Sequence, residues 1–268
     1  MDGRRKYQIG ADLSFAKQSA IWDLQVRQFL LPKLDHEPSE CEDVIAVNTE
    51  NSRFAVADGA TEAFDARHWA ERLATRWVEN ESALTVEDFR EWVTQEGREL
   101  HDSWNCLSLS WYSEEKARTG SFAAFVGVEL ELKTDPPSWK AIALGDACLV
   151  HCRNKALMKS FPLSRSDSFN AAPVLVASDP SMHENTMKSL VIEAGECESG
   201  DTLLLLSDAV ASWFLKRLEK NDFAANDFLQ TQEDDQLKHF FDEERLHGRM
   251  RNDDLAVLRI EIQQRRMS

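Results

Sequence analysis

The chain has 268 residues, of which 43% are hydrophobic and 29% charged, and it carries a formal net charge of −16. This composition is typical of a globular protein and excludes an intrinsically disordered chain. The excess of acid argues against a nucleic-acid-binding face, and no apolar run approaches the ~20 residues that a membrane-spanning helix needs. For these reasons we expect a protein that binds neither nucleic acid nor a membrane. Because no secretory signal follows the first methionine, we also expect it to be cytoplasmic.

The sequence shows no internal boundary. It contains no repeat, no low-complexity tract and no linker rich in glycine and serine, so we expect a single domain over residues 1–268. The five cysteines occur without a CxxC pair or zinc-ligand spacing. This pattern indicates reduced thiols and argues against a disulfide or zinc framework.

Several short apolar segments are typical of β-strands. The segment SFAAFVGVELEL ends in alternating apolar and acidic residues, as in a strand with one buried face. The segment TLLLL is a continuous apolar run, as in a buried strand. In chain order, we expect strands at 43–48, 54–57, 121–132, 139–152 with a break at Gly145-Asp146, 202–206 and 255–262.

Helical spacing of apolar residues occurs between these strands. The apolar residues from Ala66 to Trp77 fall on one face of a helix, and Thr85 with Asp88 resembles a capping box at the start of a second. Further helices are expected at 209–218 and 234–246. Grouped strands and grouped helices favour an α+β fold, in which helices pack outside antiparallel sheets.

Acidic residues stand at the edges of five expected strands. They are Glu42 with Asp43, Asp58, Asp146, Asp208, and Asp253 with Asp254. A single aspartate in such a place is usually a turn or cap residue, but converging carboxylates would repel one another unless cations lay between them. Mg²⁺ and Mn²⁺ prefer oxygen ligands, and two such ions ~3.5–4 Å apart can activate a water for attack on phosphorus.

The segments around these acids resemble the ordered motifs of metal-dependent protein phosphatases of type 2C. The matching segments are CEDVIAV (41–47), VADG (56–59), LGDACLV (144–150), GDTLLLLSDAV (200–210) and NDDLAVL (252–258). Thr119-Gly120-Ser121 resembles a further motif of small residues, and the resemblance covers about residues 42–262. It implies two antiparallel β-sheets packed as a sandwich, with helices on both outer faces. It also implies hydrolysis of phosphoserine and phosphothreonine on proteins by a metal-activated water.

The resemblance assigns a role to each acid. Asp58 would bridge two Mn²⁺ or Mg²⁺ ions, and the carbonyl oxygen of Gly59 would bind one of them. Asp208 and Asp253 would bind the other, so that Asp58, Asp208 and Asp253 carry catalysis. Two further acids of the first motif, Glu42 and Asp43, would bind directly or through water. In some members a third ion is present, and Asp146 would hold it here.

Two positions depart from the family pattern. Many members have an arginine that grips the phosphate four residues before Glu42, where this chain has Pro38. Some have a histidine two residues after the bridging aspartate, where this chain has Ala60. Three hypotheses therefore stay open: an active protein phosphatase, a phosphatase-like regulatory or binding protein with little activity, and a metal-dependent hydrolase of a small phosphate ester.

Overall fold

The computed structural model describes residues 15–18, 22–79, 84–105, 111–169, 172–231 and 233–265. Within these ranges the strands form two sheets, and all their pairings are antiparallel. The first sheet has the order β1 (Phe15–Gln18), β2 (Trp22–Leu31), β12 (Leu255–Gln264), β11 (Asp201–Leu206), β7 (Cys148–Arg153) and β8 (Ala156–Phe161). The second has the order β10 (Val191–Glu196), β6 (Ser138–Leu144), β5 (Phe122–Glu131), β4 (Arg53–Gly59) and β3 (Asp43–Asn48), and β9 (Val176–Ala177) pairs with β5.

The two sheets pack face to face, and their facing side chains form one hydrophobic core. Strand β11 shows why its last four residues, Leu203 to Leu206, are all apolar. Leu203 and Leu205 point into the core between the sheets, whereas Leu204 and Leu206 point outward, toward the helices. Burial on both faces leaves no exposed position along these four residues.

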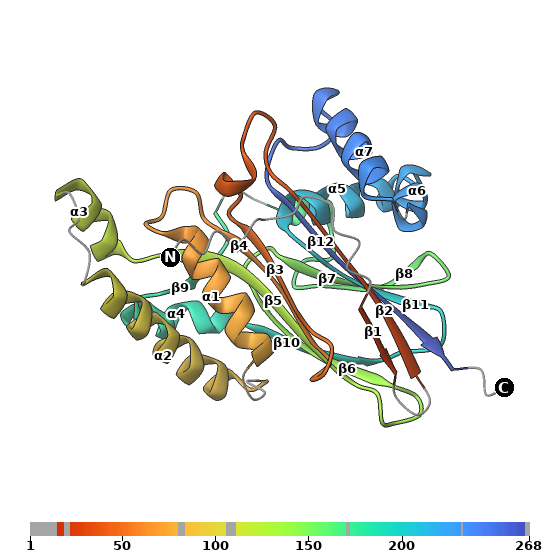
Figure 1. Cartoon of the computed structure of the whole chain (residues 1–268), viewed down its shortest axis with the longest axis horizontal. Coiled ribbons are helices and arrows are strands. Elements are labelled where there is room, and N and C mark those ends of the chain that lie inside the picture. The colour runs from red at the N-terminus through yellow and green to blue at the C-terminus, as the bar shows by residue number, and fades with distance from the viewer. Residues whose placement is uncertain are drawn as a thin grey trace, which may run out of the picture.

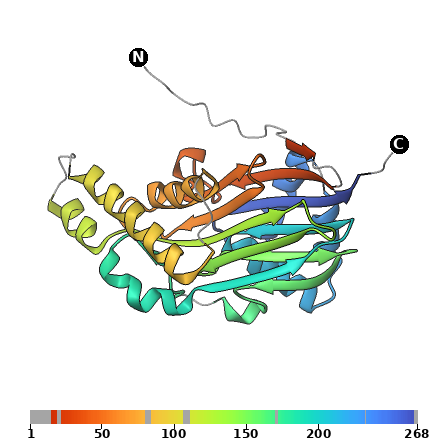
Figure 2. The same cartoon turned by 90° about the horizontal axis from the view of Figure 1, so that it is seen from below.

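Helices cover both outer faces of the sandwich (Figure 1). Helices α1 (Ala66–Glu79) and α2 (Val86–Trp104) pack on the second sheet, and α5 (Asp208–Glu219), α6 (Ala224–Gln230) and α7 (Asp234–Leu246) pack on the first. The remaining α-helices are α3 (Trp111–Thr119), which projects beyond one end of the strands in Figure 2, and α4 (His183–Thr186). Among the described residues, none of the helices has the length and apolar character needed to cross a membrane. The predicted α+β sandwich with helices on both faces is confirmed.

The predicted break at Gly145 and Asp146 carries the chain from one sheet to the other, since β6 belongs to the second sheet and β7 to the first. Gly145 adopts a φ of +104°, and a Cβ atom there would lie 2.8 Å from the Cα atom of Ala124. Only glycine meets both conditions without strain. The turn thereby places Asp146 at the edge between the sheets.

Five strands of the sheets were not predicted: β1, β2, β8, β9 and β10. In β2, Trp22, Leu24 and Val26 face the core between the sheets, but Phe29 and Leu31 face the helices. The apolar alternation changes face at the polar residues between them, so it does not register as one strand pattern. Strand β10 is an edge strand whose residues alternate between half-buried and exposed, so it contributes little apolar signal.

Candidate functional site

The predicted acids gather where strands of both sheets end. Asp43 begins β3 and lies directly opposite Asp58 at the end of β4. Asp208 begins α5 immediately after β11, and Asp253 lies just before β12. The ends of these two strands are held together, since Ala256 donates its backbone N–H to the Ser207 hydroxyl at 2.9 Å. The structure therefore brings acids from five separate segments to one edge of the sandwich.

Asp43 is the most informative of these acids. Its side chain is 3% exposed, yet neither carboxylate oxygen accepts a hydrogen bond of normal geometry from the described residues. Burial raises the pKa of this carboxyl well above its ordinary value, and Asp254, Asp208 and Asp253 raise it further, while the nearby Ser207 side chain offsets part of the effect. A buried carboxylate without a donor is costly, so this position fits a cation ligand.

The other aspartates of the group perturb one another. Burial raises the pKa of Asp58 well above its ordinary value, and the charges of Asp43, Asp208, Asp146 and Asp253 add to the effect. Burial also raises the pKa of Asp146 to about 7, with Asp208 as the next cause. Such shifts arise where like charges share a site with little water. The donor set consists of carboxylate oxygens, which hard divalent cations prefer.

We expect the metal-free chain to become more stable as the pH falls from about 8 to about 5.5. In this range folded Asp146, with a pKa of about 7, takes up a proton, whereas its ordinary pKa of 3.8 leaves it ionised when unfolded. The free energy of unfolding therefore rises as the pH falls, by about 2 kcal/mol for this residue alone. Melting curves in chelator measure the effect, and Asp146→Asn should make the dependence shallower. A melting temperature that decreases as the pH is lowered from about 8 to about 5.5 would contradict the clustering of buried carboxylates.

Gly59 is held closely beside these acids. Its backbone N–H donates to the carbonyl oxygen of Glu42 at 3.3 Å. A Cβ atom on Gly59 would lie 2.9 Å from the backbone of Ala66 and 3.2 Å from the Glu42 carbonyl. The Glu42 side chain is half-buried, and burial raises its pKa, while contact with Thr61 and the charge of Lys33 lower it. Glu42 and Gly59 thus lie next to the group, as predicted, and their part in binding metal stays a prediction.

Asp254 has a role that the sequence patterns did not reveal. Its side chain is 4% exposed, and its two carboxylate oxygens accept the backbone N–H groups of Lys33 and Glu42, each at 2.9 Å. It therefore ties the end of β2 and the start of β3 to the start of β12. The sequence signal for this residue was the doublet with Asp253, which placed it next to a predicted ligand without showing what it binds.

Two cations also belong to the site, and sequence reasoning missed both. The Lys33 ammonium lies 3.2 Å from Asp253 Oδ1 and donates to Thr61 Oγ1 at 3.1 Å. The Arg251 guanidinium forms an ion pair with Asp208, and its Nε lies 3.4 Å from Asp253 Oδ2. No motif marks either residue, although Arg251 is only two positions before Asp253.

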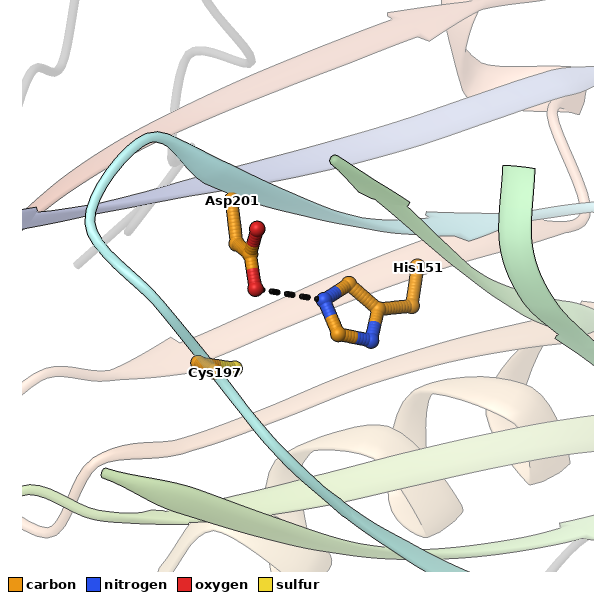
Figure 3. A group of neighbouring side chains, drawn as sticks. All are labelled: His151, Cys197 and Asp201. Atoms are coloured by element: carbon orange, nitrogen blue, oxygen red, sulfur yellow. Dashed lines mark hydrogen bonds and ion pairs between the residues drawn. The ribbon is translucent and has the colours of Figure 1, made fainter. Parts of the chain in front are cut away.

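A second group of possible metal ligands lies at the opposite end of β11 and consists of His151, Cys197 and Asp201 (Figure 3). Asp201 already accepts hydrogen bonds from His151 at 2.8 Å, from Arg153 at 2.8 and 2.9 Å, and from the Glu198 backbone at 2.8 Å. Burial raises the pKa of the Cys197 thiol to about 12, so in the metal-free protein this thiol is protonated at neutral pH. This group is best explained as a buried ion-pair network that closes the far end of the sandwich.

Comparisons with known proteins identify the fold. The sequence matches no family model and no curated protein. Three similar solved structures are PppA, a key regulatory component of T6SS in Pseudomonas aeruginosa (16% identity, TM-score 0.57, covering 89% of this chain and 97% of that one), the photosystem II phosphatase PBCP (15%, 0.59, 89% and 98%), and the catalytic domain of the serine/threonine protein phosphatase PstP in complex with two manganese ions (14%, 0.57, 90% and 99%). At these identities the comparisons show a shared fold, and the predicted resemblance in fold is confirmed.

Proposed function

We propose that this chain, which has the fold of metal-dependent protein phosphatases, hydrolyses phosphoserine and phosphothreonine on proteins. The observation that carries the proposal is the buried Asp43 carboxylate, whose oxygens accept no hydrogen bond of normal geometry from the described residues and which faces Asp58 in a group of converging aspartates. Such a group fits divalent cations, and the similar PstP structure holds two manganese ions. The single domain over residues 1–268 and the cytoplasmic location remain part of this proposal.

The residues that would hold two or three Mn²⁺ or Mg²⁺ ions are those that the resemblance indicates. They are Glu42, Asp43, Asp58, Gly59, Asp146, Asp208 and Asp253. When bound, these ions would activate a water and stabilise the charge on the phosphoryl oxygens. Asp254 would position the ligand segments by holding the backbones of Lys33 and Glu42.

The two cations of the site would compensate for the departure at Pro38. A phosphate dianion that enters a group of carboxylates needs positive charge close to its oxygens. The Lys33 ammonium and the Arg251 guanidinium are the cations that lie against Asp253 and Asp208. Ala60 offers no proton for the leaving alcohol, so that proton would come from water.

Release of phosphate from a phosphothreonine peptide, with Mn²⁺ and with excess chelator, tests the proposal. We expect release that requires Mn²⁺ or Mg²⁺ and stops in chelator. Full activity in excess chelator would contradict metal-dependent hydrolysis.

The pairing of Asp253 and Asp208 with Lys33 and Arg251 also favours a second candidate, a phosphatase-like binding protein with little activity. Binding of Mn²⁺ and phosphopeptide without release of phosphate would support that candidate instead.

Replacing Lys33 by methionine should raise KM for a phosphopeptide about tenfold, with a smaller change in kcat. A charge-assisted hydrogen bond is worth about 1.5–3 kcal/mol, and its loss weakens binding of the phosphate more than the chemical step. Steady-state kinetics at saturating Mn²⁺ measure the split. The matched control is Lys159→Met, because Lys159 pairs with Glu193 and lines the pocket around His151 at the far end of the sandwich. An unchanged KM for Lys33→Met would exclude contact between Lys33 and the phosphate.

A further inference from the structure

An apolar pocket of about 330 Å³ opens beside the carboxylate group. Its walls include the side chains of Ala60, Ala63, Phe64, Phe122 and Leu175. The volume falls at the lower end of the range for small-ligand pockets, about 300–1,000 Å³. The charged residues in its lining, Glu62 and Lys116, are of opposite sign, so they provide no net charge to attract an ionic ligand.

Two residues that line the pocket lie next to segments of the carboxylate group. Ala60 directly follows Gly59, and its backbone N–H donates to the carbonyl oxygen of Phe122 at 2.9 Å, which fixes the loop to the start of β5. On the other side, Leu175 packs against the Gly145 turn, since a Cβ atom on Gly145 would lie 3.3 Å from Leu175 Cδ2. The pocket therefore begins one residue from the predicted metal ligand Gly59, and its Leu175 wall lies beside Gly145, the residue before Asp146.

The far wall of the pocket is held in place by aromatic packing. The Phe64 ring meets the Trp104 ring edge-on, with centroids 5.0 Å apart. The Trp104 indole N–H in turn donates to Asp65 Oδ2 at 2.7 Å. Because these contacts fix Phe64 before any ligand arrives, the pocket is formed in the free protein and a ligand does not have to order it.

From this arrangement we infer that the pocket receives a large apolar side chain, such as leucine or phenylalanine, that neighbours the phosphorylated residue of the substrate. The inference rests on the proposed function, because the phosphate at the carboxylate group determines where the rest of the peptide lies. One residue of extended chain spans ~3.3–3.6 Å, so a side chain one or two positions away reaches a pocket that starts at Ala60. The site would thus select phosphopeptides by an apolar neighbour.

Two phosphothreonine peptides that differ in the residues next to the phosphothreonine, leucine in one and alanine in the other, test the inference. We expect the leucine peptide to have a kcat/KM at least about tenfold higher, since each methylene in an apolar pocket is worth about 10–200-fold. Ala63→Leu, which fills the pocket, should bring the two peptides close to equal. The matched control is Ala156→Leu, the same change at an exposed position of β8 that does not line the pocket.

Hydrolysis of p-nitrophenyl phosphate separates the two proposals, because this substrate has no neighbouring residue to bind. Ala156→Leu, which lies outside the pocket, should leave its Mn²⁺-dependent rate unchanged. If the chain hydrolyses p-nitrophenyl phosphate, and the leucine and alanine peptides have the same kcat/KM as each other, the pocket assignment is overturned and the phosphatase proposal stands. If the wild-type chain hydrolyses none of the three substrates with Mn²⁺, the phosphatase proposal fails, and the assignment of the pocket to a substrate fails with it.

Discussion

Asp58→Asn is expected to lower kcat by at least ~10²-fold while the fold stays intact. Asparagine keeps the shape of the side chain but removes the negative charge that would offset two divalent ions. Loss of preorganised electrostatic stabilisation typically reduces kcat by about 10²–10³-fold. Steady-state rates at saturating Mn²⁺ measure the loss, and circular dichroism confirms folding. Asp146→Asn should lower the rate less, since Asp146 would hold only the third ion.

The matched control for Asp58→Asn is Asp135→Asn, because Asp135 is exposed in the loop between β5 and β6, at the opposite end of β5 from the residue that pairs with Asp58. A second measurement separates a role in metal binding from a role in folding. Since burial and neighbouring carboxylates raise the pKa of Asp58, removal of its charge should stabilise the metal-free protein at pH 8. Near-normal activity in a folded Asp58→Asn variant would show that this residue is not the bridging ligand, and the two-metal assignment would fail with it.

Mn²⁺ should raise the melting temperature of the wild-type chain, because it binds the folded carboxylate group and not the separated acids of the unfolded chain. At a hundredfold excess over the dissociation constant, the free energy of unfolding rises by about 2.7 kcal/mol. For a protein of this size that corresponds to roughly 5–10 °C. Thermal melts over a Mn²⁺ titration measure the shift, and chelator should reverse it.

Asp43→Asn provides the sharpest comparison for the metal-induced shift. In the metal-free protein this change removes a buried carboxylate that accepts no hydrogen bond of normal geometry from the described residues, so the variant should melt at a higher temperature than the wild type in chelator. In Mn²⁺ it should gain less than the wild type does, because a ligand has been lost. A melting curve of the wild type that is the same with and without Mn²⁺ would show that the acids are ordinary caps and turn residues.

Local patterns in the sequence determined much of the fold and most of the candidate site. TLLLL could be recognised as a buried strand because every residue of β11 after Thr202 is buried. Thr85 marked the start of α2, where its hydroxyl accepts the backbone N–H of Asp88 at 3.1 Å. The acids at strand ends could likewise be located from the sequence, since a strand end is a local feature and an Asp placed there is visible without knowledge of the partner strands.

Contacts between distant segments were decided by the tertiary structure alone. The Asp254 carboxylate binds the backbones of Glu42 and Lys33, which lie 212 and 221 positions away in the sequence. Lys33 and Asp253 form an ion pair although they too are far apart in the sequence, and the residues around one of them do not indicate the other. The perturbed pKa of Asp43 and the apolar pocket beside Gly59 also arise from contacts between segments that are distant in the sequence. Burial and like-charge repulsion depend on which strand ends the two sheets bring together, and no pattern within one segment records that.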